Sequence, residues 1–239
     1  MSEVVSWLVE QFWGIVLGVI TALIVTFIVT FLPLKEDVRY KAIFYRRKLA
    51  KLIFNPAIKV CYTIKTGSIE DKNMRLSELV RDIREKLVQS NFKFKSEYGN
   101  ASIFEFILGN TEVEIVITPS YIVDEEEEPL VDYLQCDFKL TECKYRNFNG
   151  HLLDLIQVFR MLEVSLENIT GKWTGESLTC EIKRLYEFVG VLKDLKMSSL
   201  TGTIGGKYTI ELFENKLLVY GTIETKMTSI IKDIITYYF

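Results

Sequence analysis

The residue types that most often carry chemistry are sparse in this chain of 239 residues. Its only histidine is His151, and its cysteines are Cys61, Cys136, Cys143 and Cys180. None of the cysteines forms a C-x-x-C pair, so a zinc site would have to gather its ligands from distant places in the sequence. The spacing therefore favours buried thiols and a helix-capping or surface histidine over a metal centre.

Two other stretches have the composition of ligand-binding loops without the required spacing. Gly202 to Lys207 (GTIGGK) lacks the G-x-x-x-x-G-K-[ST] arrangement of a phosphate loop and stands between two strand-like segments, which predicts a hairpin turn. Residues 124–129 (DEEEEP) lack the glycine turn that separates calcium ligands, which is typical of a solvated loop. We therefore expect no catalytic, cofactor-binding or metal-binding residues, and a protein that is not an enzyme.

One long apolar segment determines where in the cell all the other elements are expected to lie. Residues 11–34 (QFWGIVLGVITALIVTFIVTFLPL) carry no charge. At about 1.5 Å per helical residue they span roughly 36 Å, enough to cross a hydrocarbon core of about 30 Å. The residues before them include no Lys or Arg, and Phe31-Leu32-Pro33 is not a signal-cleavage sequence. Residues 1–34 are therefore interpreted as an N-terminal flank and an uncleaved, single-pass transmembrane helix.

Basic residues follow this segment and give it a direction. Residues 35–54 carry seven basic side chains against Glu36 and Asp37, whereas residues 1–34 carry none. The positive-inside rule then predicts a cell-membrane protein with its N-terminus outside and its soluble domain in the cytoplasm. We expect these basic residues to contact anionic lipid: Lys35, Arg39, Lys41, Arg46, Arg47, Lys48 and Lys51.

Small residues recur every four positions within the apolar segment. Gly14, Gly18 and Ala22 share one face of a helix, where small side chains let two membrane helices approach closely. This pattern predicts a homo-oligomer formed through the transmembrane helix. The alternative is that glycine and alanine are simply common in membrane helices.

Residues 35–54 form a second predicted helix beside the membrane. An apolar stripe on it excludes the group Arg46-Arg47-Lys48 and consists of Val38, Ala42, Tyr45, Leu49 and Leu52. Three interpretations follow from this pattern. The helix can lie on an anionic lipid surface, pair with a second copy of itself, or serve as a basic flank that packs on the soluble domain.

The rest of the chain predicts strands and helices in an order that occurs twice. In a first half, residues 55–172, we expect strands at 57–65, 92–97, 102–108, 112–118 and 132–141, and helices at 75–90 and 150–166. In a second half, residues 173–239, we expect strands at 177–183, 200–204, 207–213 and 216–223, a helix at 185–195 and a C-terminal helix beginning near Met227. The two halves share element order and turn positions, with very little residue identity.

This order predicts an α+β fold in which one curved antiparallel sheet carries helices on its convex side. Over residues 57–239 it is similar to the two-repeat saddle of TATA-binding-protein-like folds and to helix-grip folds, at the level of topology. The resemblance implies an architecture and no functional residues. Residues 55–239 hold 22 basic and 28 acidic side chains, a balance of −6, which argues against a nucleic-acid partner.

Together these patterns predict a non-catalytic, membrane-anchored protein that presents a cytoplasmic α+β domain for protein–protein interaction or self-association. The expected partners are membrane lipid, a second copy and an unidentified protein. The alternative is a tethered sensing domain that binds a small molecule, lipid or nucleotide in the concave face of the sheet. Aromatic residues on the predicted strands can either line that face or pack the core: Tyr62, Phe104, Phe106, Tyr208 and Tyr220.

Overall fold

A computed structural model describes residues 16, 19–21, 24, 36–67, 75–122, 130–170, 172–182, 200–204, 206–213 and 215–239. The chain divides into two compact units, which are described separately. The first comprises residues 1–55 and 233–238, and the second comprises residues 56–232 with Phe239. The C-terminal helix α6 (Met227–Tyr238) contributes its beginning to the second unit and its end to the first.

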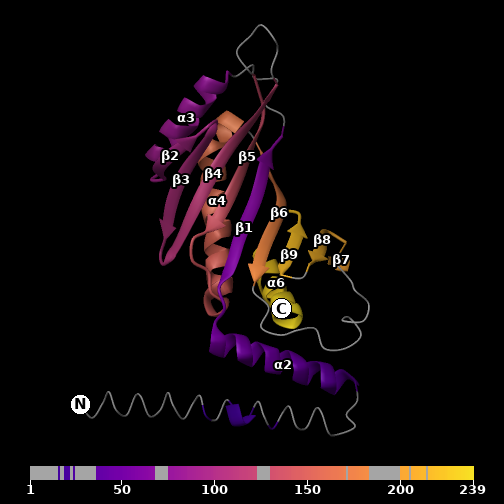
Figure 1. The fold of residues 1–239 in the computed structure, drawn as a ribbon. Helices are drawn as coiled ribbons and strands as arrows, with labels where there is room; N and C mark the ends of the chain where they lie inside the picture. The colour runs from indigo at the N-terminus through magenta and orange to yellow at the C-terminus, as the bar shows by residue number, and fades with distance from the viewer. Residues whose placement is uncertain are drawn as a thin grey trace, which may run out of the picture. The chain divides into compact units, whose positions relative to one another are not determined.

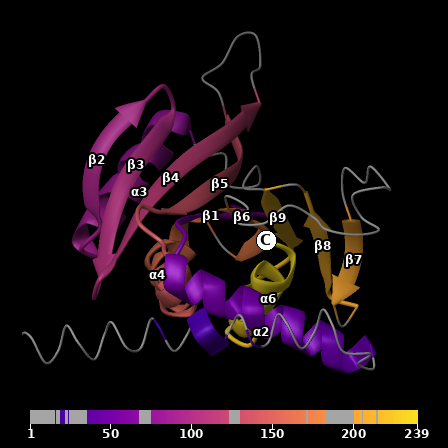
Figure 2. The ribbon, with the colours of Figure 1, turned by 60° about the horizontal axis from the view of Figure 1, so that its bottom comes forward.

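The second unit is built on one antiparallel sheet, in which the described residues form nine strands (Figure 1). Their spatial order is β2-β3-β4-β5-β1-β6-β9-β8-β7, and Figure 2 shows them side by side from β2 at one edge to β7 at the other. The strands are β1 (Ile58–Thr66), β2 (Lys93–Tyr98), β3 (Ala101–Leu108), β4 (Thr111–Ile122), β5 (Leu130–Leu140), β6 (Trp173–Ile182), β7 (Leu200–Ile204), β8 (Tyr208–Leu212) and β9 (Lys216–Tyr220).

Alternation along the central strands gives the sheet one buried face. In β1 every second residue is buried, from Ile58 to Thr66, and the residues between them are half-buried or exposed. Tyr62 pairs with Phe138 of β5 on one side and with Leu178 of β6 on the other, and all three are buried. Because directly paired residues point to the same face, the apolar side chains form one layer across the sheet.

Among the described elements, α4 (Phe148–Thr170) and α3 (Leu76–Gln89) cover that layer. Helix α4 contacts β3, β4 and β5 and runs behind the strands in Figure 1. The ring of its Phe159 meets Tyr62 edge-on at 5.9 Å and Phe138 at 6.1 Å between centroids. Helix α3 contacts α4 and β2 and buries one apolar stripe of Leu79, Ile83 and Leu87. The residues on this stripe recur four apart, as the sequence pattern requires of an amphipathic helix.

The predicted α+β fold with a large antiparallel sheet and several helices is confirmed. Strand β1 pairs with both β5 and β6, so the two predicted halves share one continuous sheet. Helix α4 is longer at both ends than the predicted 150–166, because Phe148 and Ile169 are also buried against the core. The helix predicted at 185–195 lies outside the described residues.

The turns of the meander β2-β3-β4 form at two glycines. Gly99 and Gly109 have φ angles of 58° and 59°, in the left-handed region that a side chain at Cβ disfavours. They reverse the chain between β2 and β3 and between β3 and β4.

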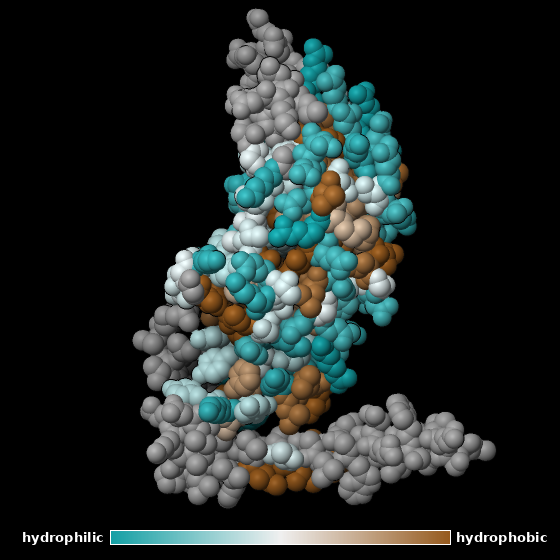
Figure 3. Space-filling view, turned by 180° about the vertical axis from the view of Figure 1, so that it is seen from behind, coloured by the Kyte–Doolittle hydropathy of each residue, from teal (hydrophilic) through white to brown (hydrophobic). Residues whose placement is uncertain are grey.

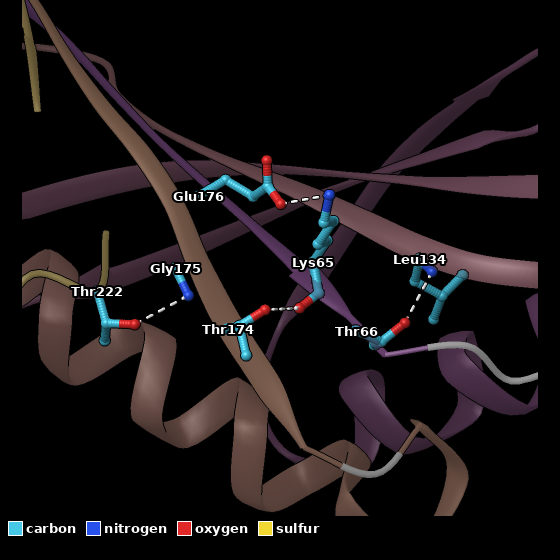
Figure 4. Close-up of polar contacts among 7 residues, drawn as sticks. All are labelled: Lys65, Thr66, Leu134, Thr174, Gly175, Glu176 and Thr222. Carbon is cyan, nitrogen blue, oxygen red and sulfur yellow. Dashed lines mark hydrogen bonds and ion pairs between the residues drawn. The ribbon is translucent and has the colours of Figure 1, made fainter. Parts of the chain in front are cut away.

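Gly175, near the start of β6, allows Thr222 and the Tyr62 side chain to approach its backbone closely (Figure 4). A Cβ atom at this position would lie 2.5 Å from both the Tyr62 hydroxyl and the Thr222 Cα. The pairing of β1 with β6 shifts register here, so that Glu176 has no partner on β1. The Gly175 amide donates to the Thr222 hydroxyl at 3.1 Å, and the buried Tyr62 hydroxyl accepts from the Ile223 amide at 3.3 Å.

Side-chain contacts join β1 to its neighbours at the same end. The Thr66 hydroxyl accepts from the Leu134 amide at 3.0 Å, and the Thr174 hydroxyl donates to the Lys65 carbonyl at 3.2 Å. Lys65 and Glu176 form an ion pair that spans the register shift (Figure 4). These contacts hold β1 against β5 and β6, and the hydrogen bonds of residues 221–223 to Gly175, Glu176 and Tyr62 hold that segment against the centre of the sheet.

The helix-bearing side of the second unit has a mixed surface. Val88 on α3 and Leu153 and Val164 on α4 are exposed. In Figure 3, which views the molecule from behind, hydrophobic side chains form separate brown groups among teal hydrophilic ones. This side therefore has no single large apolar patch in the part of the chain that is described.

Within the described residues, no helix is both long and apolar enough to cross a membrane. The predicted transmembrane segment 11–34 lies outside the described part of the chain except for Val16, Val19, Ile20, Thr21 and Ile24, all of which are helical. Val19, Ile20 and Ile24 are about half exposed. The association residues Gly14, Gly18 and Ala22 lie outside the described residues.

Candidate membrane-contact helix

Helix α2 (Glu36–Phe54) carries most of the residues for which the sequence predicts an interaction. It begins one residue after the predicted start at 35 and ends at the predicted residue. Asn55 follows with a φ of 45°, and its amide donates to the Lys51 carbonyl at 2.8 Å. A left-handed Asn followed by Pro56 stops the helix, because Pro disfavours helical backbone in the residue before it.

Two basic residues of α2 bind the end of α6 within the first unit. The Arg47 guanidinium donates to the Tyr237 carbonyl, and the Lys51 ammonium donates to the carbonyls of Ile235 and Thr236. The last carbonyls of a helix have no partner in their own helix and form the negative end of its dipole. Arg47 and Lys51 therefore satisfy and neutralise the C-terminal end of α6.

Burial changes the protonation of Lys51. The side chain is 0% exposed, and this burial, together with the positive charge of Arg47, lowers the Lys51 pKa to about 7. The carbonyl partners favour the ammonium form, since only that form donates three hydrogen bonds. Lys51 is thus a buried amine with backbone oxygens as partners, and it is charged below about pH 7.

The other basic residues of α2 point away from this contact. At about 100° per residue, Lys41 and Lys48 share one stripe with Tyr45, while Arg47 and Lys51 lie on a different stripe. Lys41 is exposed and Lys48 is half-buried. The side of α2 that faces away from the end of α6 is here called the outer side. Arg46 is exposed and lies at the other edge of this outer side from Lys41 and Lys48. The seven predicted lipid contacts therefore do not share one surface.

The predicted apolar stripe of α2 falls between these flanking cations. Tyr45 is 64% exposed, and Leu52 and Ile53 are exposed by 38% and 39%. Leu49 and Ala42 are half-buried. The outer side of α2 is consequently an apolar band with Lys41 and Lys48 along one edge and Arg46 along the other.

A shallow pocket of about 320 Å³ adjoins the outer band. It is lined by one cation and four aromatic side chains, Tyr40, Lys41, Phe44, Tyr45 and Tyr237. Two of its rings already face cations, since Arg47 lies 5.8 Å from the Tyr237 ring centroid and Lys48 lies 5.8 Å from that of Phe44. Such rings suit the interface between lipid and water, where an apolar body and a polar tip are both accommodated.

No protein-family model matches this chain, and no match was found among curated proteins. The assignment of a site therefore depends on the geometry alone.

Two of the predicted lipid-contact residues are without described side chains. Lys35 lies outside the described residues, and Arg39 lies in α2 with its side chain outside the described part. The sequence pattern did not distinguish Arg47 and Lys51 from the other cations, although their spacing of four residues places them on one face of α2. It also missed Tyr40, Phe44 and Tyr237, because no pattern in the sequence brings α2 and the end of α6 together.

The face of the sheet opposite α3 and α4, here called the open face, carries charges of both signs. Glu105 accepts from Lys95 at 2.8 Å and from Lys93 at 3.3 Å, and Lys139 lies 3.8 Å from Glu114. The hydrogen bond from Lys95 lowers the pKa of Glu105 to about 2, and the hydrogen bond to Glu105 raises the pKa of Glu112. These groups neutralise one another across neighbouring strands.

The aromatic residues expected on the strands mostly fill the core. Tyr62, Phe104, Phe106 and Tyr208 are buried, and only Tyr220 of the five is exposed, at 39%. Tyr220 donates to Glu211 on the neighbouring strand at 3.2 Å. These five residues therefore do not form a row of aromatic side chains on the open face.

His151 joins α4 to β4 through a short chain of hydrogen bonds. The Thr111 hydroxyl donates to Asp154, and the His151 Nδ1 lies 2.7 Å from the same hydroxyl oxygen. Thr111 of β4 is thus hydrogen-bonded to His151 and Asp154 of α4, and the three residues link the helix to the strand.

The cysteines have the environment of packed side chains. Cys136, Cys143 and Cys180 are buried and Cys61 is half-buried, and none forms a disulfide. Burial raises the pKa of Cys143 to about 12 and also raises the pKa of Cys136 and Cys180. Among the described residues, no three His, Cys, Asp or Glu side chains are grouped so that they could hold a metal ion. Residues 124–129 lie outside that part.

Proposed function

We propose that this protein is a single-pass membrane protein that holds its sheet domain at the cytoplasmic surface for interaction with another protein or with a second copy of itself. The observation that carries the proposal is the juxtaposition of uncharged residues 11–34 with α2, which starts at Glu36. Two residues of chain span at most about 7 Å. If residues 11–34 cross the bilayer, α2 therefore begins at its surface.

Further support comes from the helical, half-exposed residues Val19, Ile20 and Ile24. Exposed apolar side chains on a helix are costly in water and favourable in lipid. The excess of basic residues after the segment supports an outside N-terminus and a cytoplasmic domain.

The two-repeat architecture forms part of the proposal. Strands β1 and β6 pair at the centre, and the remaining strands run outward in the sequences β5-β4-β3-β2 and β9-β8-β7. This order supports a saddle of two related halves similar to TATA-binding-protein-like folds. The mutually paired charges of the open face and the acidic balance of residues 55–239 argue against nucleic acid as the partner.

Topology is tested with the full chain expressed in cells. We expect the protein to remain in membranes after carbonate washing, and its sheet domain to be digested by protease only when vesicles are opened. Release by carbonate would overturn the anchor. Digestion of the domain in sealed right-side-out vesicles would overturn the orientation while leaving the anchor in place.

Self-association is tested by crosslinking the full chain in membranes. Gly14→Leu/Gly18→Leu adds bulk to the small-residue face and is expected to lower the yield of crosslinked dimer several-fold. Val16→Leu/Ile20→Leu changes a different face of the same segment and serves as the matched control. Equal dimer yields in both variants would remove the glycine face from the proposal.

The sensing alternative has less support in the arrangement of side chains. Four of the five aromatic residues considered for the sheet surface are buried, and the charges of the open face have partners. Interaction through a surface is therefore the function that we propose, and ligand sensing remains the alternative.

A further inference from the structure

We propose that α2 lies flat on an anionic membrane surface and binds lipid phosphates through Lys41, Arg46 and Lys48, while Arg47 and Lys51 are reserved for the end of α6. This inference rests on the proposed function, because it assigns the lipid class and the residues through which the anchored domain meets the membrane. The evidence is the division of the basic residues of α2 between two sides of the helix.

The inner side of α2 is already occupied. Lys51 is fully buried and donates to two carbonyls of α6, and Arg47 donates to a third. A cation that satisfies buried carbonyls cannot also reach a lipid phosphate without leaving them unpaired. These two residues are therefore excluded from the lipid contact that the sequence assigned to all seven.

The outer side has the pattern of an interfacial helix. Its apolar band includes the exposed Tyr45 and Ile53, and cations stand along both edges. When such a helix lies in the plane of the headgroups, the apolar band enters the acyl boundary and the long basic side chains extend to the phosphates on either side. With 19 residues, α2 would cover about 28 Å of the surface.

Charge distinguishes lipid from a second copy of the helix as the occupant of this surface. Between residues 38 and 54 there is no acidic side chain. Two copies of α2 packed through the outer band would place Lys41, Arg46 and Lys48 beside identical cations, and like charges beside a helix seam oppose pairing. An anionic leaflet supplies the complementary charge that a second copy lacks.

The aromatic pocket extends the same contact. Tyr40, Tyr45 and Tyr237 contribute phenol groups and Lys41 contributes the cation around about 320 Å³. Phenol rings favour the interface, and their hydroxyls together with the ammonium can bind a phosphate oxygen. The pocket therefore offers space for a headgroup next to the edge formed by Lys41 and Lys48.

The test uses the full chain in nanodiscs made of phosphatidylcholine with or without phosphatidylserine. A spin label at Tyr45→Cys, in a Cys61→Ser background, reports collisions with oxygen in lipid and with a nickel chelate in water. A label at the exposed Val164 of α4 is the aqueous reference. Recovery of the chain in discs after carbonate washing reports the anchor separately, so failure of the proposed function is distinguishable from failure of this inference.

We expect the label at position 45 to be protected from nickel in discs with phosphatidylserine and more accessible in discs without it. The triple variant Lys41→Gln/Arg46→Gln/Lys48→Gln should lose this protection, by about fivefold in the surface-bound population for each cation removed. The control variant is Lys86→Gln/Lys144→Gln/Lys207→Gln, which removes the same amount of charge from exposed positions of the second unit. In this variant the label should remain protected from nickel.

Two results would overturn the inference. Free access of nickel to position 45 in phosphatidylserine discs would show that the band does not lie on lipid. Strong dipolar broadening between labels at position 45 would show that a second copy covers the band. The variant Arg47→Gln should retain protection of the label, and equal losses in this variant and the triple variant would contradict the division of the basic residues.

Discussion

Lys95 of the sheet and Lys51 of α2 both donate to oxygen atoms, but their surroundings differ in every other respect. Lys95 is partly exposed on the open face and pairs with Glu105, and this hydrogen bond raises its pKa. Lys51 is buried with backbone carbonyls for partners, and burial lowers its pKa to about 7. The carboxylate of Glu105 favours the charged form of Lys95. Lys51, in contrast, has lost its water of hydration without gaining a carboxylate partner.

The difference shows how each unit makes use of charge. On the sheet, acids and bases alternate across strands, so they neutralise one another in water and contribute little to stability. On α2 there is no acid after Asp37, so the cations must find carbonyl dipoles or an external anion. We therefore expect the stability of the sheet unit to depend mainly on the shape of its side chains. The contact between α2 and the end of α6 should depend on the charge of its side chains.

The largest effect is expected from a change of shape in the sheet unit. Gly175→Val places side-chain atoms where Thr222 and the Tyr62 hydroxyl already lie, and should lower the free energy of unfolding by about 3 kcal/mol. Urea unfolding of the full chain in detergent measures this loss. Gly202→Ala is the control, because its Cβ would meet no atom within 4 Å. Equal stabilities of the two variants would contradict the close approach at Gly175.

An intermediate effect is expected at Lys51 and depends on pH. Lys51→Met keeps an apolar stem but leaves two carbonyls of α6 without their donor, at a cost of about 1–3 kcal/mol. Because the folded pKa lies below the ordinary value of 10.5, the unfolded chain binds more protons than the folded chain above about pH 7. The free energy of unfolding should then rise with pH, by at most about 1.4 kcal/mol per pH unit from this group.

The measurement compares urea unfolding of the wild type and Lys51→Met at pH 7 and pH 8. Buried cysteines act in the opposite direction at higher pH, since their raised pKa values keep them protonated only in the folded chain. Both proteins share these cysteines, so the difference between them isolates Lys51. An identical pH dependence in the two proteins would show that Lys51 does not titrate in this range.

The smallest effect is expected on the open face. Lys95→Gln removes an exposed cation from Glu105, which keeps Lys93 as a partner at 3.3 Å. The free energy of unfolding should fall by less than in Lys51→Met, and the loss should shrink in high salt. The same urea titration at low and high salt checks this prediction. A loss as large as that of Lys51→Met would erase the contrast between exposed and buried lysines.

Local patterns were sufficient to predict most elements of the fold. The alternation in residues 57–65 predicted β1, and the periodicity of residues 75–90 predicted α3. The two hairpin turns at Gly99 and Gly109 fall between strands that the sequence predicted. The ends of α4 were less predictable, because Phe148 and Ile169 extend the helix through tertiary contacts that no local rule contains.

The role of single side chains was less accessible from the sequence. The spacing of Lys41 and Lys48 relative to Arg47 and Lys51 indicates two sides of α2, yet nothing in it shows that α6 binds one of them. His151 was expected as a capping or surface residue, but its link to Thr111 and Asp154 depends on how α4 meets β4. These contacts join residues that are 40 to 190 positions apart in the chain.

The sequence by itself determined the charge-free segment 11–34, the basic helix that follows it and the order of strands and helices. These features depend on composition and on local periodicity, which short stretches of chain carry in full. The tertiary structure decided that β1 and β6 pair in one sheet, and that Arg47 and Lys51 cap α6 while Lys41, Arg46 and Lys48 point away. Pairing of distant segments depends on shape and on the loss of water over the whole chain, and local sequence holds neither.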